Sequence, residues 1–396
     1  MRKKVCVLGL GYIGLPTAAL LASRDYDVHG VDIVQSTVDT INRGEIHIVE
    51  KGLNSYVQKA VNEKKLIANT SPTFSDIFII AVPTPFQDNY VPNLDYVMSA
   101  TESIAPFIKN NNLIILESTS PVGTTEKVKN KLKDCGVDIS NIFIAHCPER
   151  VLPGNIMNEL VENDRIVGGV NEESIKVATS FYETFVTGNI YGTDDKTAEL
   201  AKLAENSFRD VNIAFANELS IICDELEIDV RELIKLTNKH PRVDILSPGA
   251  GVGGHCIAVD PWFIVNASKE NSKLIKTARM RNLYKSEWVV QKIEQEAKKF
   301  ESTKNRKPKI ACMGLSFKPD IDDLRESPAL KIVKTLIDNN HDIIAVDPNV
   351  ESYEDFDLHD LDYALEHADL VAFLVGHKEF IDLDIKTKLD FCGALK

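Results

Sequence analysis

The sequence predicts an α/β protein in which two αβ domains with parallel sheets are joined by a long central helix and a helical segment. Two observations lead to this prediction. A short apolar run, a glycine turn and a second apolar run ending in an acid occur within residues 4–32, and the pattern recurs weakly from residue 309. A helical pattern of apolar residues extends from 193 to 226. We therefore expect domains at 1–192, 193–300 and 301–396.

The first element is an apolar strand at 4–8, followed directly by the turn Gly9-x-Gly11-x-x-Gly14 and a helix. The first glycine makes the turn, the second lets the backbone approach a pyrophosphate, and the helix N-terminus faces the phosphate charge. The next strand ends at Asp32, 18 residues after Gly14, where an acid can bind ribose hydroxyls. This arrangement predicts a Rossmann-like domain that binds NAD in preference to NADP. The alternative is the same fold with an empty site.

Later strands of this domain also end in polar residues. Two apolar runs lead to Thr84 and Thr119, and a third leads to a loop that contains Glu149 and Arg150. Ligands of open parallel sheets lie beyond the carboxyl ends of the strands, so all four residues are site candidates. For Glu149 and Arg150 the alternative is an ordinary ion pair on the surface.

The predicted helix at 193–226 carries Lys202, Asn206 and Arg209 on one face. A stripe of polar residues is usually a solvated face. Here the surrounding faces are largely apolar, so we expect the helix to be buried between domains, where the stripe has to meet a polar group.

A glycine-rich stretch, Gly251-Val-Gly-Gly-His-Cys256, ends in a cysteine and is followed by Asp260. Glycines allow close approach of the backbone to a ligand, and a thiolate is a strong nucleophile. The alternative is that Cys256 is a small buried apolar residue.

After a polar segment at 301–308, which we interpret as a linker, the opening pattern returns. An apolar run leads into Gly314, and a second run ends at Asp347. The third glycine of the first motif is missing, so this domain should accommodate a different phosphate ligand.

Composition excludes several classes of protein. The chain has 396 residues and a net charge of −14, which argues against nucleic acid and anionic membranes as partners. Its seven cysteines contain no C-x-x-C pair, so we expect neither a disulfide framework nor a metal site. Without a signal-like N-terminus or a run of 18 apolar residues, the sequence predicts a soluble cytoplasmic protein.

A dinucleotide site, a thiol and a Lys/Asn pair together indicate an oxidation that passes through an aldehyde. The thiolate of Cys256 would add to the aldehyde so that a second hydride can leave, giving a thioester that water hydrolyses. Lys202 and Asn206 would stabilise the oxyanions, and Glu149 or Asp260 would activate or order the water.

These motifs resemble those of the UDP-glucose/GDP-mannose dehydrogenase family over nearly the whole chain. The resemblance is carried by Gly9-x-Gly-x-x-Gly14, Val82-Pro-Thr-Pro85, Pro148-Glu149, Lys202-x-x-x-Asn206, Gly253-Gly-x-Cys256 and Phe317-Lys-Pro with Arg325-Glu-Ser. Within the family, five segments are similar in sequence to members acting on UDP-N-acetylmannosamine: Gly44–Glu50, Cys147–Gly154, Glu205–Glu218, His240–Arg242 and Cys256–Trp262.

The resemblance implies oxidation of C6 of UDP-N-acetylmannosamine to the uronate with two NAD, for surface polysaccharide synthesis, by a homodimer or larger homo-oligomer built on the central helix. It implies that Cys256 is the nucleophile and Lys202 the proton donor or acceptor. Implied substrate contacts are Arg150, Val151, Lys202, Asn206, Arg209, His240, Arg242, Gly253, Phe317 and Lys318. Implied cofactor contacts are Gly9, Gly11, Tyr12, Ile13, Gly14, Asp32, Thr84, Thr119 and Arg325.

Some features depart from the family pattern and leave alternatives open. Ala258 stands where many relatives that oxidise UDP-glucose have proline, and the C-terminal residues 389–396 fit poorly. UDP-N-acetylglucosamine and UDP-glucose are alternative substrates. Two other hypotheses are a two-electron epimerase or reductase in which Cys256 is structural, and a regulatory protein that binds a nucleotide sugar. An intact set of Lys202, Asn206, Cys256 and Asp260 argues against the last.

Overall fold

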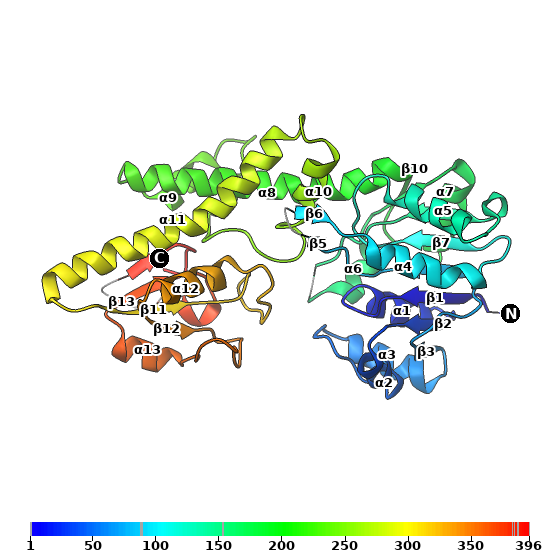
Figure 1. Cartoon of the computed structure of the whole chain (residues 1–396), viewed down its shortest axis with the longest axis horizontal. Helices are drawn as coiled ribbons and strands as arrows, with labels where there is room; N and C mark the ends of the chain where they lie inside the picture. The colour runs from blue at the N-terminus through cyan, green and yellow to red at the C-terminus, as the bar shows by residue number, and fades with distance from the viewer. Residues whose placement is uncertain are drawn as a thin grey trace. The chain divides into compact units, whose positions relative to one another are not determined.

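The structure is a computed structural model that describes residues 2–87, 90–152, 154–381, 383, 385 and 388–395. The chain forms two compact units. The N-terminal unit comprises Met1–Ala204 and Trp262–Ala267, and the C-terminal unit comprises Glu205–Pro261 and Ser268–Lys396. Each unit contains an αβ sheet with parallel strands, as the sequence predicted (Figure 1). The three-domain division at 1–192, 193–300 and 301–396 remains a prediction.

In the described part of the N-terminal unit, eight strands form one sheet in the order β10-β9-β8-β7-β4-β1-β2-β3. The strands are β1 (Lys4–Leu8), β2 (Asp27–Val31), β3 (Leu66–Asn69), β4 (Ile77–Ile80), β7 (Leu113–Leu116), β8 (Phe143–His146), β9 (Arg165–Gly169) and β10 (Ile190–Asp194). Strands β8 and β9 pair antiparallel, whereas the other neighbours in this sheet pair in parallel. The strand pattern of the sequence did not indicate this reversal.

The helices of this unit follow the strands, as expected for crossover connections. They are α1 (Gly14–Ser23), α2 (Gln35–Asn42), α3 (Leu53–Asn62), α4 (Asp95–Ile104), α5 (Thr124–Asp134), α6 (Ile156–Glu162) and α7 (Glu172–Tyr182), with a small hairpin of β5 (Phe86–Gln87) and β6 (Val91–Pro92) and short 3-10 turns at Ala105–Phe107 and Ile139–Asn141.

The central strands are apolar on both faces because the sheet is covered on both sides. In β1, Val5 and Val7 belong to one hydrophobic cluster, whereas Cys6 and Leu8 belong to another. Successive side chains of a strand point to opposite faces, so these two clusters are the cores above and below the sheet. The continuous apolar run that predicted the strand therefore reports its double-sided burial.

The C-terminal unit has a smaller sheet in the order β12-β11-β13-β14, and all its neighbours pair in parallel within the described residues. Its elements are α9 (Val230–Thr237), α11 (Lys273–Lys304), β11 (Lys309–Met313), α12 (Pro328–Asp338), β12 (Asp342–Val346), α13 (Leu361–His367), β13 (Leu370–Phe373), a 3-10 turn at Lys378–Phe380 and β14 (Lys388–Asp390). Among the described residues, no helix is both long enough and apolar enough to span a bilayer.

Two helices, α8 (Asp195–Glu225) and α10 (Asp260–Ala267), contain residues of both units. The long helix α8 was predicted almost to the residue, and Asp194 begins it by accepting a hydrogen bond from the Thr197 amide at 2.9 Å. The expected burial of its polar stripe is wrong in part: Asn206 is buried, Lys202 is half-buried and Arg209 is exposed.

The predicted linker at 301–308 is also wrong in part. Helix α11 continues to Lys304, and Asn305 ends it with a left-handed backbone of φ 53°. Charged residues such as Glu and Lys are good helix formers, so a polar composition indicated exposure and not the absence of a helix.

Candidate active site

The three glycines of the turn in the N-terminal unit differ in whether an added Cβ would clash with the chain. Gly9 has φ +87°, and a Cβ there would lie 2.6 Å from the Ala81 carbonyl oxygen; a Cβ on Gly14 would lie 1.8 Å from the Gly9 oxygen. Both glycines are therefore required by the chain itself. At Gly11, by contrast, a Cβ would meet no atom within 4 Å. The space over Gly11 is open at the point where a pyrophosphate has to approach the turn.

Asp32 lies at the carboxyl end of β2 and is held by two backbone amides. Its Oδ2 accepts a hydrogen bond from Leu10 N at 3.0 Å, and its Oδ1 accepts one from Val34 N at 3.0 Å. The carboxylate is therefore fixed beside the glycine turn, in the position where ribose hydroxyls are bound. Together with the open space over Gly11, this arrangement fits NAD.

The structure brings Thr84 and Thr119 together at the carboxyl ends of β4 and β7. The Thr84 hydroxyl donates a hydrogen bond to the Thr119 carbonyl oxygen at 2.5 Å, and both residues are half-buried. Tyr12 and Ile13, in the glycine turn, are half-buried as well. These residues thus lie on the edge of the sheet at which the sequence predicted the cofactor.

Glu149 belongs to a buried cluster of charged residues. The alternative considered from the sequence, an ion pair on the surface, does not describe it. Its Oε2 pairs with Arg165 Nη1 at 3.0 Å, and its Oε1 accepts a hydrogen bond from the Arg150 backbone amide at 2.8 Å. The Arg150 guanidinium donates to the Asp164 carbonyl at 3.1 Å. Next to it, Val151 is half-buried.

A second carboxyl group, Glu117, belongs to the same cluster and was missed in the sequence. It follows β7 directly, is 2% exposed, and its Oε1 accepts a hydrogen bond from the Tyr182 hydroxyl at 3.1 Å. Burial, reinforced by the charge of Glu149, raises the pKa of Glu117 to about 7. Its position at a strand's carboxyl end is the same signal that identified Thr119, and could have identified it.

In the C-terminal unit, the loop with Cys256 places two predicted site residues in contact. The Asn206 side-chain amide donates a hydrogen bond to Asp260 Oδ2 at 2.5 Å, and both residues are buried. The backbone amide of Asp260 in turn donates to the Cys256 carbonyl oxygen at 2.8 Å. Cys256 is half-buried. The carboxylate and the amide that could order a reacting group are thus anchored to the nucleophile candidate's own backbone.

A buried network holds this loop from α8 and α11, and no part of it was found from the sequence. Arg279 pairs with Asp210 at 2.8 Å and also donates to the Ile257 carbonyl at 3.3 Å. Asn217 Oδ1 accepts a hydrogen bond from Gly249 N at 2.9 Å, at the start of the loop. Burial raises the pKa of Asp210 to about 6 although Arg279 opposes this rise. Both ends of the loop are therefore tied to the two long helices.

The space beside two glycines near Cys256 is occupied by residues of the chain itself, among them Phe317. A Cβ on Gly254, which has φ +82°, would lie 2.8 Å from the Phe317 ring, and a Cβ on Gly253 would lie 2.8 Å from Phe317 Cβ. Phe317 is half-buried, and Lys318 is exposed. The segment predicted to hold the nucleotide therefore packs directly on the Cys256 loop.

The remaining predicted residues lie in exposed positions. Arg325 forms an ion pair with Asp323 at 2.6 Å. His240 and Arg242 follow α9 on an exposed loop, where the Arg242 amide lies 3.3 Å from His240 Nδ1. In the C-terminal stretch 389–396, the backbone amides of Cys392 and Gly393 donate to Asp390, and Lys396 lies outside the described residues. The roles of these residues remain predictions.

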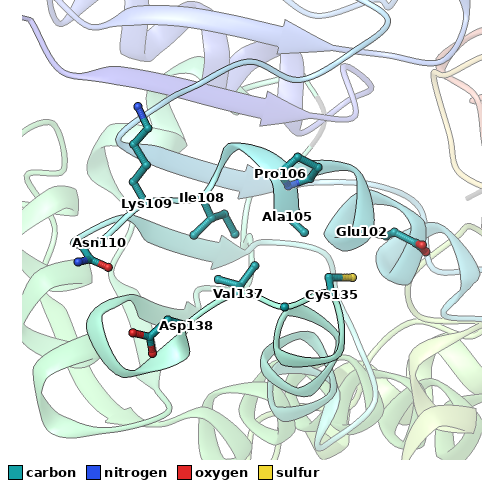
Figure 2. Close-up of a pocket in the computed structure, with 10 residues that line it drawn as sticks. Glu102, Ala105, Pro106, Ile108, Lys109, Asn110, Cys135, Val137 and Asp138 are labelled. Carbon is teal, nitrogen blue, oxygen red and sulfur yellow. The ribbon is translucent and has the colours of Figure 1, made fainter.

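A cavity of about 550 Å³ lies elsewhere in the N-terminal unit, where the chain approaches the amino ends of β7 and β8 (Figure 2). It is lined by Glu102, Ala105, Pro106, Ile108, Lys109, Asn110, Cys135, Gly136, Val137 and Asp138. None of the predicted site residues is among them. Ligands of open parallel sheets bind at the other, carboxyl edge, so this cavity is not the cofactor site.

An NAD-binding sheet edge and a second αβ unit that packs on a cysteine loop define a dehydrogenase with two nucleotide-binding domains. Family models divide the chain accordingly: the NAD binding domain of the UDP-glucose/GDP-mannose dehydrogenase family matches residues 3–186, the central domain 196–284, and the UDP binding domain 311–392. The chain belongs to this family of NAD-dependent nucleotide-sugar dehydrogenases, and its cofactor is NAD.

Individual relatives are similar over nearly their whole length. The chain is 55% identical to a UDP-N-acetyl-D-mannosamine dehydrogenase of Campylobacter jejuni, with 98% of this chain and 99% of the relative covered. It is 51% identical to an NDP-N-acetyl-D-galactosaminuronic acid dehydrogenase of Ralstonia nicotianae, with 96% and 92% covered. Its fold matches the solved UDP-N-acetyl-mannosamine dehydrogenase Cap5O from S. aureus with a TM-score of 0.91 at 44% identity, covering 99% and 96%.

Proposed function

We propose that this chain oxidises C6 of UDP-N-acetyl-D-mannosamine twice, converting the primary alcohol to the carboxylate with Cys256 as nucleophile. Bound NAD supplies the hydride acceptor in both oxidations. Between them, the Cys256 thiolate adds to the C6 aldehyde and gives a thiohemiacetal, whose oxidation leaves a thioester. Water then cleaves the C–S bond, which returns the thiol and releases the acid. Overall, two NAD accept four electrons.

The contact of Asn206 with Asp260 beside Cys256 is the observation that carries this proposal. A thioester route needs a thiol together with groups that stabilise an oxyanion and order water, and Asn206 and Asp260 lie beside the Cys256 backbone. Lys202, on α8, would exchange the proton of the C6 hydroxyl. Glu149 is the other residue that the sequence suggests for activating or ordering the water.

The experiment is to count NADH formed per nucleotide sugar consumed to completion. We expect two NADH per UDP-N-acetylmannosamine from the unmodified chain. The Cys256→Ala variant should form at most one, because it can complete only the first oxidation. Cys135→Ala, which changes an exposed cysteine, is the matched control and should retain the full yield. A yield of one NADH from the unmodified chain would exclude the covalent route.

A second candidate substrate is favoured by one specific observation, the 51% identity to the Ralstonia dehydrogenase named for an N-acetyl-galactosaminuronic acid product. The NADH yield should therefore also be measured with UDP-N-acetylgalactosamine, UDP-N-acetylglucosamine and UDP-glucose. Two NADH from one of these, and not from the mannosamine sugar, would keep the mechanism and replace the substrate.

We further propose that the protein is a homodimer through α8. Phe208, Phe215 and Ile222 recur every seven residues and are 70%, 53% and 41% exposed. Apolar residues at this spacing form one stripe along a helix, which a second copy of the same helix can cover. Phe215→Glu should convert the dimer to a monomer in light scattering, whereas Ile67→Glu, on an exposed residue of β3, should not. An unchanged mass for both variants would exclude α8 as the interface.

A further inference from the structure

The C-terminal unit repeats the frame of the N-terminal unit around its glycine turn. In the N-terminal unit, Leu8 pairs with Val31 and Ile80 across the sheet; in the C-terminal unit, Met313 pairs with Val346 and Phe373. Counting onward from these paired residues, Asp347 corresponds to Asp32, and His377 corresponds to Thr84.

Two backbone hydrogen bonds hold each acid in the same way, and Asp347 Oδ2 accepts a third, from Ser316 N at 3.0 Å. Asp347 Oδ2 accepts a hydrogen bond from Leu315 N at 2.7 Å, and its Oδ1 accepts one from Asn349 N at 2.9 Å. These bonds match those of Asp32 with the residue after the first glycine and with the second residue after the acid. The frame that presents an acid to a ribose is therefore complete in both units.

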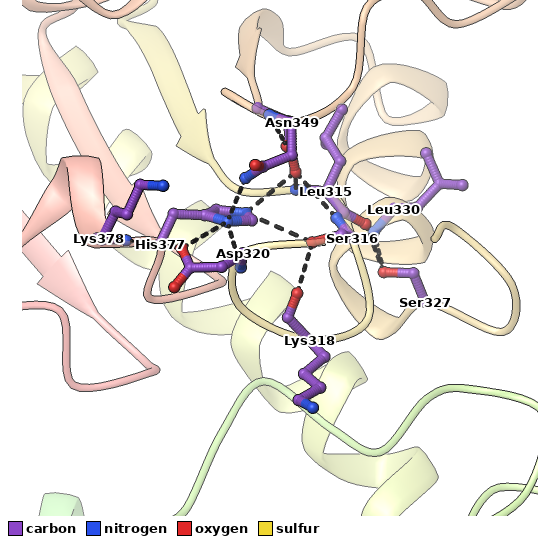
Figure 3. A network of polar contacts seen from close by, with 10 residues as sticks. Leu315, Ser316, Lys318, Asp320, Ser327, Leu330, Asn349, His377 and Lys378 are labelled. Atoms are coloured by element: carbon purple, nitrogen blue, oxygen red, sulfur yellow. Dashed lines mark hydrogen bonds and ion pairs between the residues drawn. The ribbon is translucent and has the colours of Figure 1, made fainter. Parts of the chain in front are cut away.

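The units differ in what meets that acid. Thr84 is a small side chain that donates its hydrogen bond elsewhere. His377, which Figure 3 shows within a network of polar contacts, is fully buried, and its Nε2 lies 3.2 Å from Asp347 Oδ2. The carboxylate of Asp347, whose side chain is fully buried, is thus engaged by a side chain of its own unit.

The contacts of His377 assign its tautomer. Its Nδ1 lies 3.0 Å from the Asp320 backbone N–H, which can only donate, so Nδ1 carries the lone pair. The Asn349 amide group, 2.9 Å away, is then a second donor to Nδ1. The ring proton is on Nε2 and is donated to Asp347.

His377 and its neighbour fix one end of the segment 315–320, while Asp347 fixes the other. The Lys378 amide donates to Asp320 Oδ1 at 3.0 Å, in addition to the bond from Asp320 N to His377. Asp320 has a left-handed φ of 61°, a conformation that persists in a non-glycine residue only when its surroundings hold it. Between the two anchors, the segment presents half-buried Phe317 and exposed Lys318.

We propose that His377 is a positioning residue that takes the place of a ribose over Asp347 and fixes segment 315–320 for recognition of the uridine diphosphate part of the substrate. The C-terminal unit accordingly binds its nucleotide with this segment and not over its acid, which explains how one frame serves two different nucleotides. The proposal rests on the proposed function for the identity of the bound nucleotide.

The first test measures binding of UDP and of NAD separately by calorimetry for the whole chain. In His377→Ala, the buried Asp347 carboxylate loses its hydrogen bond from His377, and the Asp320 amide loses its acceptor. We expect UDP binding by this variant to be weaker by about tenfold or more. His377→Asn, whose Oδ1 can accept from Asp320 N, should recover most of this loss. NAD binding should stay unchanged in both, as should UDP binding in the control His367→Ala, which alters an exposed residue of α13. UDP affinity equal to the unmodified chain in a folded His377→Ala would overturn the proposal.

A second pair of variants avoids the buried core. Asp320 is exposed, so Asp320→Ala should fold, lose the bond from Lys378 and weaken UDP binding by about tenfold, whereas Asp320→Asn tolerates the left-handed backbone and can accept the same bond. Equal affinities in the two variants would refute the positioning role even if His377→Ala did not fold. Absence of UDP binding by the unmodified chain would instead refute the proposed function itself.

Discussion

A change of Gly11 to alanine distinguishes the requirements of folding from the requirements of NAD binding. The backbone of Gly11 lies outside the left-handed region, and its added Cβ would meet no atom within 4 Å. Replacing glycine by alanine at a compatible backbone position stabilises a protein by about 0.4–1 kcal/mol, because the unfolded chain loses freedom. Gly11→Ala should therefore unfold at the same temperature as the unmodified chain or slightly above it.

Binding of NAD should nevertheless fall sharply in this variant. The new methyl group occupies the space over the turn and separates the pyrophosphate from the backbone amides. A hydrogen bond to a charged group contributes about 1.5–3 kcal/mol, so the loss of one bond weakens binding by roughly 10- to 150-fold. Titration of NAD against the protein, without nucleotide sugar, measures this directly.

Gly9→Ala is the matched control. Its φ of +87° costs alanine about 1–3 kcal/mol before the clash with the Ala81 carbonyl is counted, so this variant should unfold at a clearly lower temperature. An unaltered NAD affinity in Gly11→Ala would refute the placement of the pyrophosphate over Gly11. Destabilisation of Gly11→Ala as large as that of Gly9→Ala would refute the open space itself.

Two further predictions concern buried acids. Because the pKa of Glu117 is raised from 4.5 to about 7, the folded state binds its proton more tightly than the unfolded chain, and the stability from this group is complete below pH 4.5 and lost as pH rises to about 7. Glu117→Gln should gain stability relative to the unmodified chain between about pH 5 and pH 8 in urea titrations, and a constant difference would contradict the raised pKa. Asp210→Asn removes the buried carboxylate that pairs with Arg279 and should cost about 3–5 kcal/mol, whereas Asp355→Asn, in an exposed pair, should leave the stability nearly unchanged; similar losses would contradict the role of burial.

The parts of the fold that the sequence predicted are those fixed by local pattern or by a general rule of parallel sheets. The turn at Gly9 and Gly14 depends on residues adjacent in the chain, and the double-sided burial of a strand is recorded in its continuous apolar run. Asp32 lies 22 residues from its hydrogen-bond partner Leu10, yet the fold class itself brings the two strand ends together.

The parts that the sequence did not predict depend on long-range partners with no pattern of their own. Tyr182 reaches Glu117 across 65 residues, from the last residue of a helix to the end of a strand. Arg165 begins the strand that pairs antiparallel with β8, and no local signal marks an arginine for burial. Their burial follows from how the helices cover the sheet, which only tertiary packing decides.

The glycines near Cys256 show why composition alone could not distinguish a glycine that faces open space from one that packs against the chain itself. The sequence suggested that they allow a ligand to approach closely, as Gly11 does. At Gly254, however, the approaching group is the Phe317 ring, and at Gly253 the approaching groups are Glu326, Phe317 and Pro328, all of the same unit. If the nucleotide binds beside Phe317, as we propose, it contacts a residue that packs on the Cys256 loop. Binding energy from the part of the substrate that does not react can then be used to orient the Cys256 thiol.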